Sequence, residues 1–276
     1  MNDGRQKVLY NMSYEVLFCP LYSSSSGNVS LLSYRGITLL IDAGVSCKKL
    51  KEALNQIGFS SKIDAILLSH DHSDHTRCAG VFSRQLKVPI ITNHKTWKTI
   101  EDSMGNIDKG NVTLIETGDS LEIGDIQIET FPIPHDGVDP MGFCFYAGKK
   151  KISISTDLGF VSPKVASKIN HSDVLLLEAN HDVRMLMTGI YPAYLKQRIR
   201  GNYGHLSNEQ AADMLLSLNL EKTHQIYLGH LSPENNFPDL ALKTVKSILK
   251  QKGVFDSLNP SLVVAEKDRA SFCTVL

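Results

Sequence analysis

The chain has 276 residues, of which 42% are hydrophobic, and a chain of this length buries enough apolar surface to fold without disulfide bonds. Lys and Arg together number 29, as do Asp and Glu. No net charge therefore draws the whole molecule onto a polyanion, and any nucleic-acid binding has to come from a local patch.

The five cysteines include no Cys-x-x-Cys pair, which is typical of free thiols in a reducing compartment. The first residues lack the apolar core of a signal peptide, and no stretch approaches the about 18 consecutive apolar residues of a membrane span. We therefore expect a cytoplasmic protein with no membrane partner. No repeat or long linker interrupts the sequence, so we expect a single domain over residues 1–276.

In chain order, the first half is rich in predicted strands. Short apolar runs predict strands at 15–18, 29–33, 37–41, 63–68, 89–92, 112–115, 126–131, 142–146 and 152–155. Apolar residues at helical spacing predict helices at 47–57 and 95–104.

The second half alternates between helices and strands. Helices are predicted at 163–169, from the capping box of Ser207 and Gln210 to residue 218, and at 240–250, with strands at 174–177 and 225–228. Two halves that each begin with strands favour two sheets covered by helices over one doubly wound sheet.

The segment 69–75, Ser-His-Asp-His-Ser-Asp-His, directly follows the predicted buried strand 63–68. It places three imidazoles and two carboxylates within six consecutive residues, at the end of a strand, where rigid scaffolds usually carry their chemistry. A solvated, histidine-rich turn would explain one pair of histidines. This density of nitrogen and oxygen ligands instead favours one or two divalent metal ions.

Three further ligand-type residues, His135, Asp157 and His230, each follow another strand-like run. Any one of them alone is better explained as a loop residue that closes a turn. Together they predict one rim, at which ligands distant in the sequence converge on the segment 69–75.

The order His-x-His-x-Asp-His, followed by His, Asp and His, resembles the metallo-β-lactamase superfamily, with the matching positions His70, His72, Asp74, His75, His135, Asp157 and His230. The resemblance spans nearly the whole chain and includes the early segment Ile41-Asp42-Ala43-Gly44. It implies an α+β fold, a four-layer αβ/βα sandwich of two mixed β-sheets flanked by helices.

The same resemblance implies two divalent metal ions. One ion would be held by His70, His72 and His135, the other by Asp74, His75 and His230, and Asp157 would bridge them. Asp42 would orient the metal-binding loop from behind, with a turn cap as the alternative. The ligands are nitrogen and oxygen without thiolate, which permits zinc, manganese or iron.

Five further segments resemble the WalJ/YycJ-type branch of the superfamily, at 24–28, 177–182, 191–192, 196–201 and 204–208. This resemblance implies a phosphodiesterase acting on nucleic acid, namely a DNA exonuclease with 5′→3′ polarity. Glu178-Ala179 and the segment 204–207 are also similar to tRNase Z enzymes, in which a Glu–His pair supplies the leaving-group proton. The chain departs from those enzymes in Asn180-His181 and in having no long basic arm, so DNA is favoured over RNA.

We therefore expect metal-bound hydroxide to attack phosphorus, with Asp74, Glu178 and His205 as catalytic residues. His205, oriented by Glu178, would protonate the leaving oxygen, because the pKa of an unperturbed histidine lies near neutrality. The alternative is that His205 merely precedes a helix cap. The expected substrate contacts are Asn180, His181, Lys196, Arg198 and Ser207, although the basic run 196–200 is equally typical of a solvated surface.

Two other classes of function stay open. One is a small-molecule hydrolase on the same metal core, such as a cyclic phosphodiesterase, whereas Glu178 and His205 argue against lactonases and thioesterases. The other is a non-catalytic metal-binding module, which the presence of all seven ligands disfavours. The sequence leaves the oligomeric state open, a homodimer included.

Overall fold

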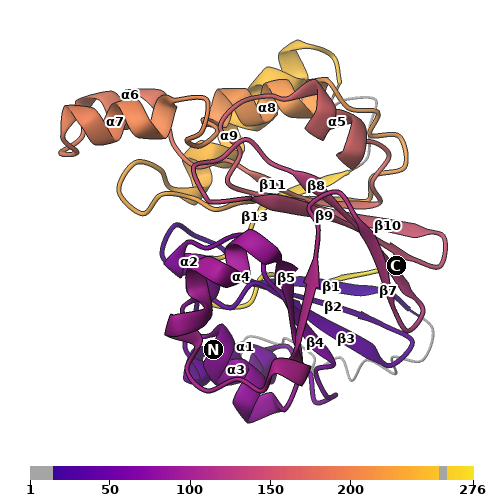
Figure 1. Cartoon of the computed structure of the whole chain (residues 1–276). Helices are drawn as coiled ribbons and strands as arrows, with labels where there is room; N and C mark the ends of the chain where they lie inside the picture. Colours follow the sequence, from indigo (N-terminus) through magenta and orange to yellow (C-terminus); the bar gives the residue numbers. More distant parts are fainter. Residues whose placement is uncertain (1–14, 255–259) are drawn as a thin grey trace, which may run out of the picture.

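The computed structural model describes residues 15–254 and 260–276, whose strands form two seven-stranded sheets (Figure 1). In order across the first sheet, these are β14 (Thr274–Val275), β1 (Leu17–Tyr22), β2 (Val29–Tyr34), β3 (Ile37–Ile41), β4 (Ala65–Leu67), β5 (Ile90–Asn93) and β6 (Val112–Ile115). Pairing is antiparallel from β14 to β3 and parallel from β3 to β6.

The second sheet repeats this mixed pattern. Its strands are β13 (Ser261–Val264), β12 (Gln225–Gly229), β11 (Val174–Glu178), β10 (Lys150–Ser155), β9 (Met141–Ala147), β8 (Ile126–Pro132) and β7 (Ser120–Ile123). Pairing is antiparallel from β7 to β10 and parallel from β10 to β13. The predicted hairpin of β9 and β10 turns at Gly148, whose φ of 61° favours glycine.

Helices cover the outer face of each sheet (Figure 1). Those on the side of the first sheet are α1 (Cys47–Gln56), α2 (Ser73–Thr76), α3 (Ala79–Leu86) and α4 (His94–Ile100), with the 3₁₀ turns η1 (Glu101–Met104) and η2 (Lys109–Asn111). Those on the side of the second sheet are α5 (Pro163–Ile169), α6 (Val183–Thr188), α7 (Ala193–Arg200), α8 (Asn208–Leu216) and α9 (Pro238–Gln251).

Three apolar clusters separate the four layers. Leu50 of α1 and Phe82 of α3 pack in the cluster beneath the first sheet. Phe18 of β1 and Phe143 of β9 meet in the cluster between the sheets. Leu215 of α8 lies in the cluster above the second sheet. This order of helix, sheet, sheet and helix confirms the predicted four-layer fold.

Most predicted helices and strands are present. One predicted helix is divided, and several elements of the structure were not predicted. The predicted helix 95–104 is α4 followed by the 3₁₀ turn η1, and the predicted capping box of Ser207 and Gln210 forms at the start of α8. The sequence did not predict β7, β13, β14, α2, α3, α6 or α7. Because α6 buries only Leu186 and α7 buries no residue, no apolar period marks these two helices.

Three of the predicted site residues reverse the chain just past a strand. Asp42, Asp157 and His230 have φ values of 63°, 60° and 56°, in the left-handed region that residues other than glycine rarely adopt. They follow β3, β10 and β12. Such backbone strain clusters at functional sites, and here it turns three polar side chains toward the same edge of the sandwich.

Gly44 lets the loop after β3 lie directly against the segment that carries the expected ligands. The Asp74 carbonyl accepts a hydrogen bond from the Asn28 amide at 2.8 Å, and Gly44 N–H donates to the Asn28 carbonyl at 2.9 Å. A Cβ atom at position 44 would lie 1.6 Å from the Asp74 carbonyl oxygen. Only glycine therefore fits at this contact.

We expect Gly44→Ala to lower the free energy of unfolding by about 1–3 kcal/mol or more, because the new methyl group must displace backbone atoms. Thermal unfolding measures the loss. Gly110→Ala is the matched control, since its Cβ would lie 3.4 Å from the Asp108 carboxylate, an ordinary contact. Equal melting temperatures for the two variants would contradict the close approach at Gly44.

Candidate metal centre

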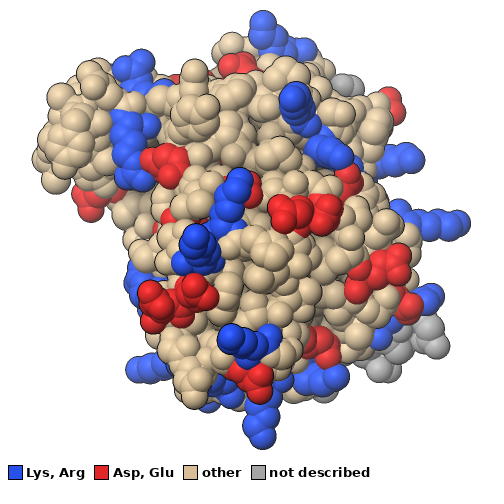
Figure 2. Space-filling model, in the orientation of Figure 1, with Lys and Arg blue, Asp and Glu red and all other residues tan. Residues whose placement is uncertain are grey.

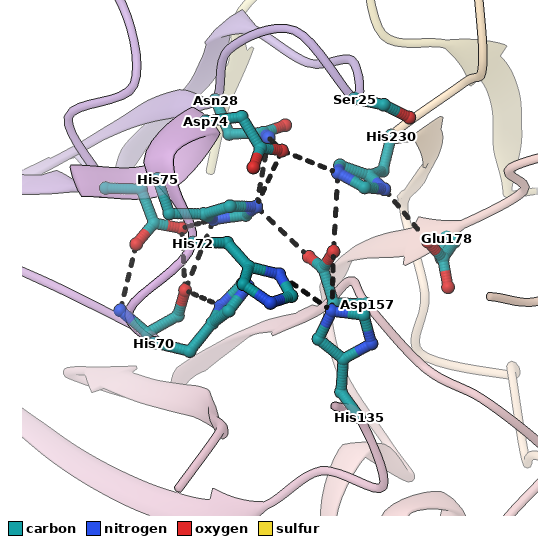
Figure 3. Close-up of polar contacts among 12 residues, drawn as sticks. Ser25, Asn28, His70, His72, Asp74, His75, His135, Asp157, Glu178 and His230 are labelled. Carbon is teal, nitrogen blue, oxygen red and sulfur yellow. Dashed lines mark hydrogen bonds and ion pairs between the residues drawn. The ribbon is translucent and has the colours of Figure 1, made fainter. Parts of the chain in front are cut away.

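The seven predicted ligands come from loops at one edge of the two sheets. Four lie on the loop after β4 and on α2: His70, His72, Asp74 and His75. The others follow β8, β10 and β12, respectively: His135, Asp157 and His230. Their side chains point toward one another (Figure 3), so the structure brings together residues that are far apart in the sequence.

Two of the overlapping groups that the ligand atoms form correspond to the expected ligand sets, and a third consists of His70, His75 and Asp157. Atoms within 4.8 Å of one another are offered by His70, His72 and His135 in one group and by Asp74, His75 and His230 in the other. Asp157 lies between the groups, with Oδ2 3.3 Å from His75 Nε2 and Oδ1 3.6 Å from His135 Nε2. This arrangement supports the expected ligand sets.

The imidazoles are held from outside the cluster by one ring nitrogen each. His75 Nδ1 donates to Asp42 Oδ2 at 2.7 Å, and His135 Nδ1 donates to the Gly204 carbonyl at 3.0 Å. In both rings Nε2 is left facing the cluster. Outer hydrogen bonds of this kind set the tautomer and the orientation of metal-binding histidines.

The remaining rings also have one nitrogen beside a protein partner outside the cluster. His70 Nδ1 donates to Ser69 Oγ at 2.9 Å. His230 Nδ1 donates to Glu178 Oε1 at 2.9 Å. His72 is turned the other way, with Nδ1 3.2 Å from His135 Nε2 and Nε2 3.5 Å from Asp136 Oδ1. Each ring therefore presents one nitrogen inward and has its other nitrogen beside a protein partner.

Two buried atoms test whether these residues fit a cation. His70 Nε2 and Asp157 Oδ2 have no hydrogen-bond partner within the described part of the chain. Buried polar atoms are nearly always hydrogen-bonded, so both atoms need another partner in the space that they face. A divalent cation satisfies a lone pair of each, and the residues therefore fit metal binding.

Protonation states agree with this fit for His70, His135 and the two carboxylates. Burial lowers the pKa of His70 and His135, so both are neutral ligands at pH 7. Burial raises the pKa of Asp74 and Asp157, but the neighbouring imidazoles outweigh it and hold both values below the usual range. The two carboxylates are therefore anionic, which is the form that binds a cation.

For His75 and His230, burial lowers the pKa, but Asp157 and the other nearby carboxylates outweigh it and raise both values, to about 10 for His230. These two rings therefore bind a cation only after losing a proton.

Asp42 lies behind the metal-binding loop, where it was expected. Its Oδ1 accepts a hydrogen bond from Ser69 N at 2.9 Å, and its Oδ2 accepts from Ser69 Oγ at 3.1 Å as well as from His75. One buried carboxylate thus fixes both the backbone at the start of the loop and the ring of a ligand.

Glu178 and His205 form a second buried arrangement beside the cluster. Glu178 Oε1 lies 2.8 Å from His205 Nδ1 and 2.9 Å from His230 Nδ1, and Oε2 accepts from Leu158 N at 2.7 Å and Leu206 N at 3.1 Å. Glu178 and His205 also lie within ligand distance of Asp157 and His230. Both oxygens of Glu178 are thus engaged in hydrogen bonds, and Oε1 holds the rings of His205 and His230 in place.

An open hollow of about 260 Å³ lies over the cluster, lined by Ser25, His72, Ser73, Asp74, Asp157, Arg198, His205 and His230. Arg198 is thus the expected substrate contact that reaches this hollow. Its Nε donates to Asp136 Oδ2 at 2.5 Å, and Asp136 Oδ1 lies 3.5 Å from both His72 Nε2 and His135 Nε2.

The other expected substrate contacts lie elsewhere. Asn180 is buried and donates to the His230 carbonyl and Ser25 Oγ. His181 is buried, and Ser207 Oγ accepts from Gln210 N as the cap of α8. The side chains of Asn180 and Ser207 hold the loops behind the hollow, whereas His181 Nδ1 has no hydrogen-bond partner within the described part of the chain.

Lys196 also lies away from the hollow. Its Nζ donates to the carbonyls of Met187 at 2.9 Å and Gly189 at 2.7 Å. These carbonyls belong to the end of α6, where a cation is stabilising. Of the basic run 196–200, the part that reaches the hollow is Arg198.

Asp136 was not singled out from the sequence, and Ser25 and Asn28 were named only within the segment 24–28 that carries the family resemblance. Asn28 donates to Asp74 Oδ2 at 3.2 Å, Ser25 lines the hollow, and Asp136 joins Arg198 to the histidines. The Ser/Gly/Asn composition of 24–28 favours a plain turn. Asp136 directly follows His135, which was the available signal for it.

Comparison with known proteins agrees with the fold and the site. A family model described as a β-lactamase superfamily domain matches residues 38–231. The exodeoxyribonuclease WalJ of Streptococcus pneumoniae is 41% identical over 234 residues, which cover 84% of this chain and 87% of that protein. The exodeoxyribonuclease YycJ of Bacillus anthracis is 36% identical over 237 residues, which cover 86% and 90%.

Among solved structures, the metallo-β-lactamase fold protein YhfI of Bacillus subtilis has a TM-score of 0.68 at 17% identity, covering 95% of this chain and 100% of that one. This likeness supports the fold. The chain belongs to the metallo-β-lactamase superfamily, in its WalJ/YycJ branch, which confirms the resemblance drawn from the sequence. Among the described residues, no helix has the length and apolar character needed to cross a membrane.

We expect Asp42→Asn to weaken binding of Zn²⁺ or Mn²⁺ by about 10- to 100-fold, the usual effect of removing a partner behind a metal-binding histidine. Calorimetric titration measures the affinity, and metal analysis after dialysis measures the content. Asp64→Asn is the matched control, since Asp64 Oδ2 also accepts a backbone hydrogen bond, from Thr38 N at 2.8 Å, and lies outside the cluster. Wild-type affinity in Asp42→Asn would contradict the orienting role.

Proposed function

We propose that this protein is a metal-dependent exodeoxyribonuclease that hydrolyses phosphodiester bonds at DNA ends, with the 5′→3′ polarity that its family resemblance implies. The WalJ and YycJ relatives are named exodeoxyribonucleases. The observation that carries the proposal is the Glu178–His205 pair, 2.8 Å apart, beside the ligand cluster. A departing alkoxide needs a proton, and this pair is placed to supply it.

The cluster supports two divalent ions, one on His70, His72 and His135 and one on Asp74, His75 and His230, with Asp157 shared. Bound there, the ions would supply an activated water and positive charge for the phosphoryl oxygens. The nitrogen and carboxylate donors suit zinc, manganese or iron.

His205 is the proposed general acid, and Glu178 is its positioning residue. Burial raises the pKa of Glu178, but His205 and His230 outweigh it and lower the value to about 2. Glu178 therefore stays anionic, accepts a hydrogen bond from His205 Nδ1 and stabilises the protonated ring. The proton for transfer is held at Nε2, on the opposite side of a ring that lines the hollow, and protonates the leaving oxygen.

Asp74 is the proposed group that orients the attacking water. It lines the hollow, and its Oδ2 lies 3.2 Å from Asn28 Nδ2 and 3.2 Å from His230 Nε2. An anionic carboxylate held in this way accepts a hydrogen bond from a water molecule and turns the oxygen lone pair toward phosphorus.

Arg198 is the proposed phosphate contact. Guanidinium groups bind phosphate oxygens through paired hydrogen bonds, and Arg198 lines the hollow next to His205. Its present partner is the Asp136 carboxylate, for which a phosphate group of the strand would compete.

We expect His205→Ala to reduce kcat on DNA by about 10²- to 10⁴-fold, the usual contribution of general acid catalysis, while metal content is kept. His94→Ala is the control, because His94 is exposed and lies on α4, outside the cluster. Steady-state kinetics and metal analysis are compared for both variants. Wild-type kcat in His205→Ala would remove the general-acid assignment.

A substrate panel tests the activity itself. We expect the protein loaded with Mn²⁺ or Zn²⁺ to shorten 5′-phosphorylated DNA, and chelation or Asp74→Ala to abolish this. Single-stranded DNA, duplex DNA, RNA and a chromogenic phosphodiester are compared. Cleavage of the chromogenic ester alone would indicate a small-molecule phosphodiesterase, and no cleavage of any substrate would indicate a metal-binding module.

A further inference from the structure

A helical hairpin of α6 and α7, residues 183–203, extends from the body beyond the edge of the sandwich (Figure 1). Of its two helices, α6 buries Leu186 and α7 buries no residue. The hairpin therefore contributes little to the apolar cores, and the packing of the fold does not explain its surface residues.

This surface is unusually apolar and aromatic. The exposed fractions are 88% for Ile190, 73% for Tyr194, 64% for Tyr203 and 48% for Met187. Two tyrosine rings are thus open to solvent on one short hairpin. An exposed aromatic ring offers a flat face on which a nucleobase can stack.

The charge of the hairpin has one sign. Residues 183–203 contain Arg184, Lys196, Arg198 and Arg200 and no Asp or Glu, although the whole chain has as many acidic as basic residues. Figure 2 shows basic side chains where the hairpin joins the body, with acidic side chains beside them, and an uncharged surface at its tip. Within the described part of the chain, Arg184 has no carboxylate partner, and Arg200 contacts Met187 Sδ.

The hairpin is joined to the catalytic pair at both ends. It follows Glu178 by a few residues and leads through Gly204 into His205. His205 N donates to the Ile199 carbonyl of α7 at 2.8 Å, and Arg198 of α7 lines the hollow. A polymer that enters the hollow beside Arg198 therefore lies next to the hairpin.

We propose that the α6–α7 hairpin is a binding surface for an unpaired DNA strand, whose bases stack on Tyr194 and Tyr203 and whose phosphates contact Arg184 and Arg200. This inference rests on the proposed function and narrows its substrate class to DNA with a single-stranded end. Paired bases in a duplex are already stacked on one another, whereas unpaired bases are free to use aromatic side chains.

The positive charge of residues 183–203, of which Arg198 pairs with Asp136 of the body, favours a nucleic acid over a second copy of the chain. Two copies meeting at this hairpin would bring like charges together, which opposes association. A polyanionic strand is instead attracted to these basic side chains, and Arg198 of the hairpin lines the hollow.

Binding of a 5′-phosphorylated oligothymidylate of about 20 nucleotides, measured by fluorescence anisotropy, tests the proposal. All proteins carry His205→Ala, so that cleavage of the oligonucleotide is slow during the measurement. We expect Tyr194→Ala/Tyr203→Ala to raise Kd by about 10- to 100-fold, since each stacked base contributes substantially. Tyr194→Phe/Tyr203→Phe keeps the rings and should bind within about 2-fold of the reference. Phe272→Ala, at a residue 81% exposed elsewhere, is the aromatic control.

Salt dependence tests the phosphate contacts. Each phosphate that a basic side chain neutralises adds about 0.7 to the slope of log K against log salt for a single strand. We expect Arg184→Ala/Arg200→Ala to flatten the slope by this amount for each of the two phosphates that the variant leaves unneutralised. An unchanged slope would overturn these contacts.

Two readouts separate this proposal from the proposed function. In proteins with His205 intact, turnover of a chromogenic phosphodiester should be the same with and without the tyrosine substitutions. If the protein with intact His205 cleaves no DNA, the exonuclease proposal fails, whatever the binding results. If Tyr194→Ala/Tyr203→Ala binds the oligonucleotide as tightly as the reference, the hairpin proposal fails. A dimer in light scattering that becomes monomeric in this variant would instead make the hairpin a subunit interface and overturn the proposal.

Discussion

The structure depends on one constraint, which is the complete or partial burial of five imidazoles and two carboxylates around a common space. Polar and charged groups removed from water are costly unless hydrogen bonds compensate them. The chain meets this requirement from outside the cluster, where Ser69, Asp42, Glu178 and the Gly204 carbonyl accept from ligand rings. The inward atoms are then left for a cation. The outer partners thus fix the ring positions and keep the inward lone pairs available.

Residues from both sheets hold the ligand group of Asp74, His75 and His230. Asp42 follows β3 of the first sheet and fixes His75, whereas Glu178 ends β11 of the second sheet and fixes His230. Both rings face Asp157, from Nε2 at 3.3 Å and 3.4 Å. The packing of the two sheets therefore sets the separation of these ligands. Because Glu178 also holds His205, the same contact places the proposed proton donor relative to the cluster.

Whether the sequence predicts the role of a site residue depends on what its side chain contacts. The ligands are predictable, because a metal needs particular side chains at the ends of strands, and His70 and His230 fall there. A substrate role for Asn180, Ser207 or Lys196 is harder to predict, because an amide, a hydroxyl or an ammonium group suits a loop carbonyl or a helix cap as well as a phosphate. Long-range pairs such as Arg198 with Asp136 leave no periodic signal. The fold was predictable from its apolar strands, but the α6–α7 hairpin was not, since it has almost no buried face.

The ligands are buried to different degrees, and this difference defines the open side of the cluster. His75 and His230 have side chains 0% and 1% exposed, whereas His72 and Asp74 are 27% and 18% exposed and line the hollow with His205. The strained backbone at Asp157 and His230 turns both toward this space, and His230 N–H donates to Ser23 Oγ at 2.9 Å, which helps offset the strain. A substrate therefore has one open side from which to approach, and Arg198 lies on it. His72 and Asp74 are the metal-ligand candidates that stay partly open to solvent on that side.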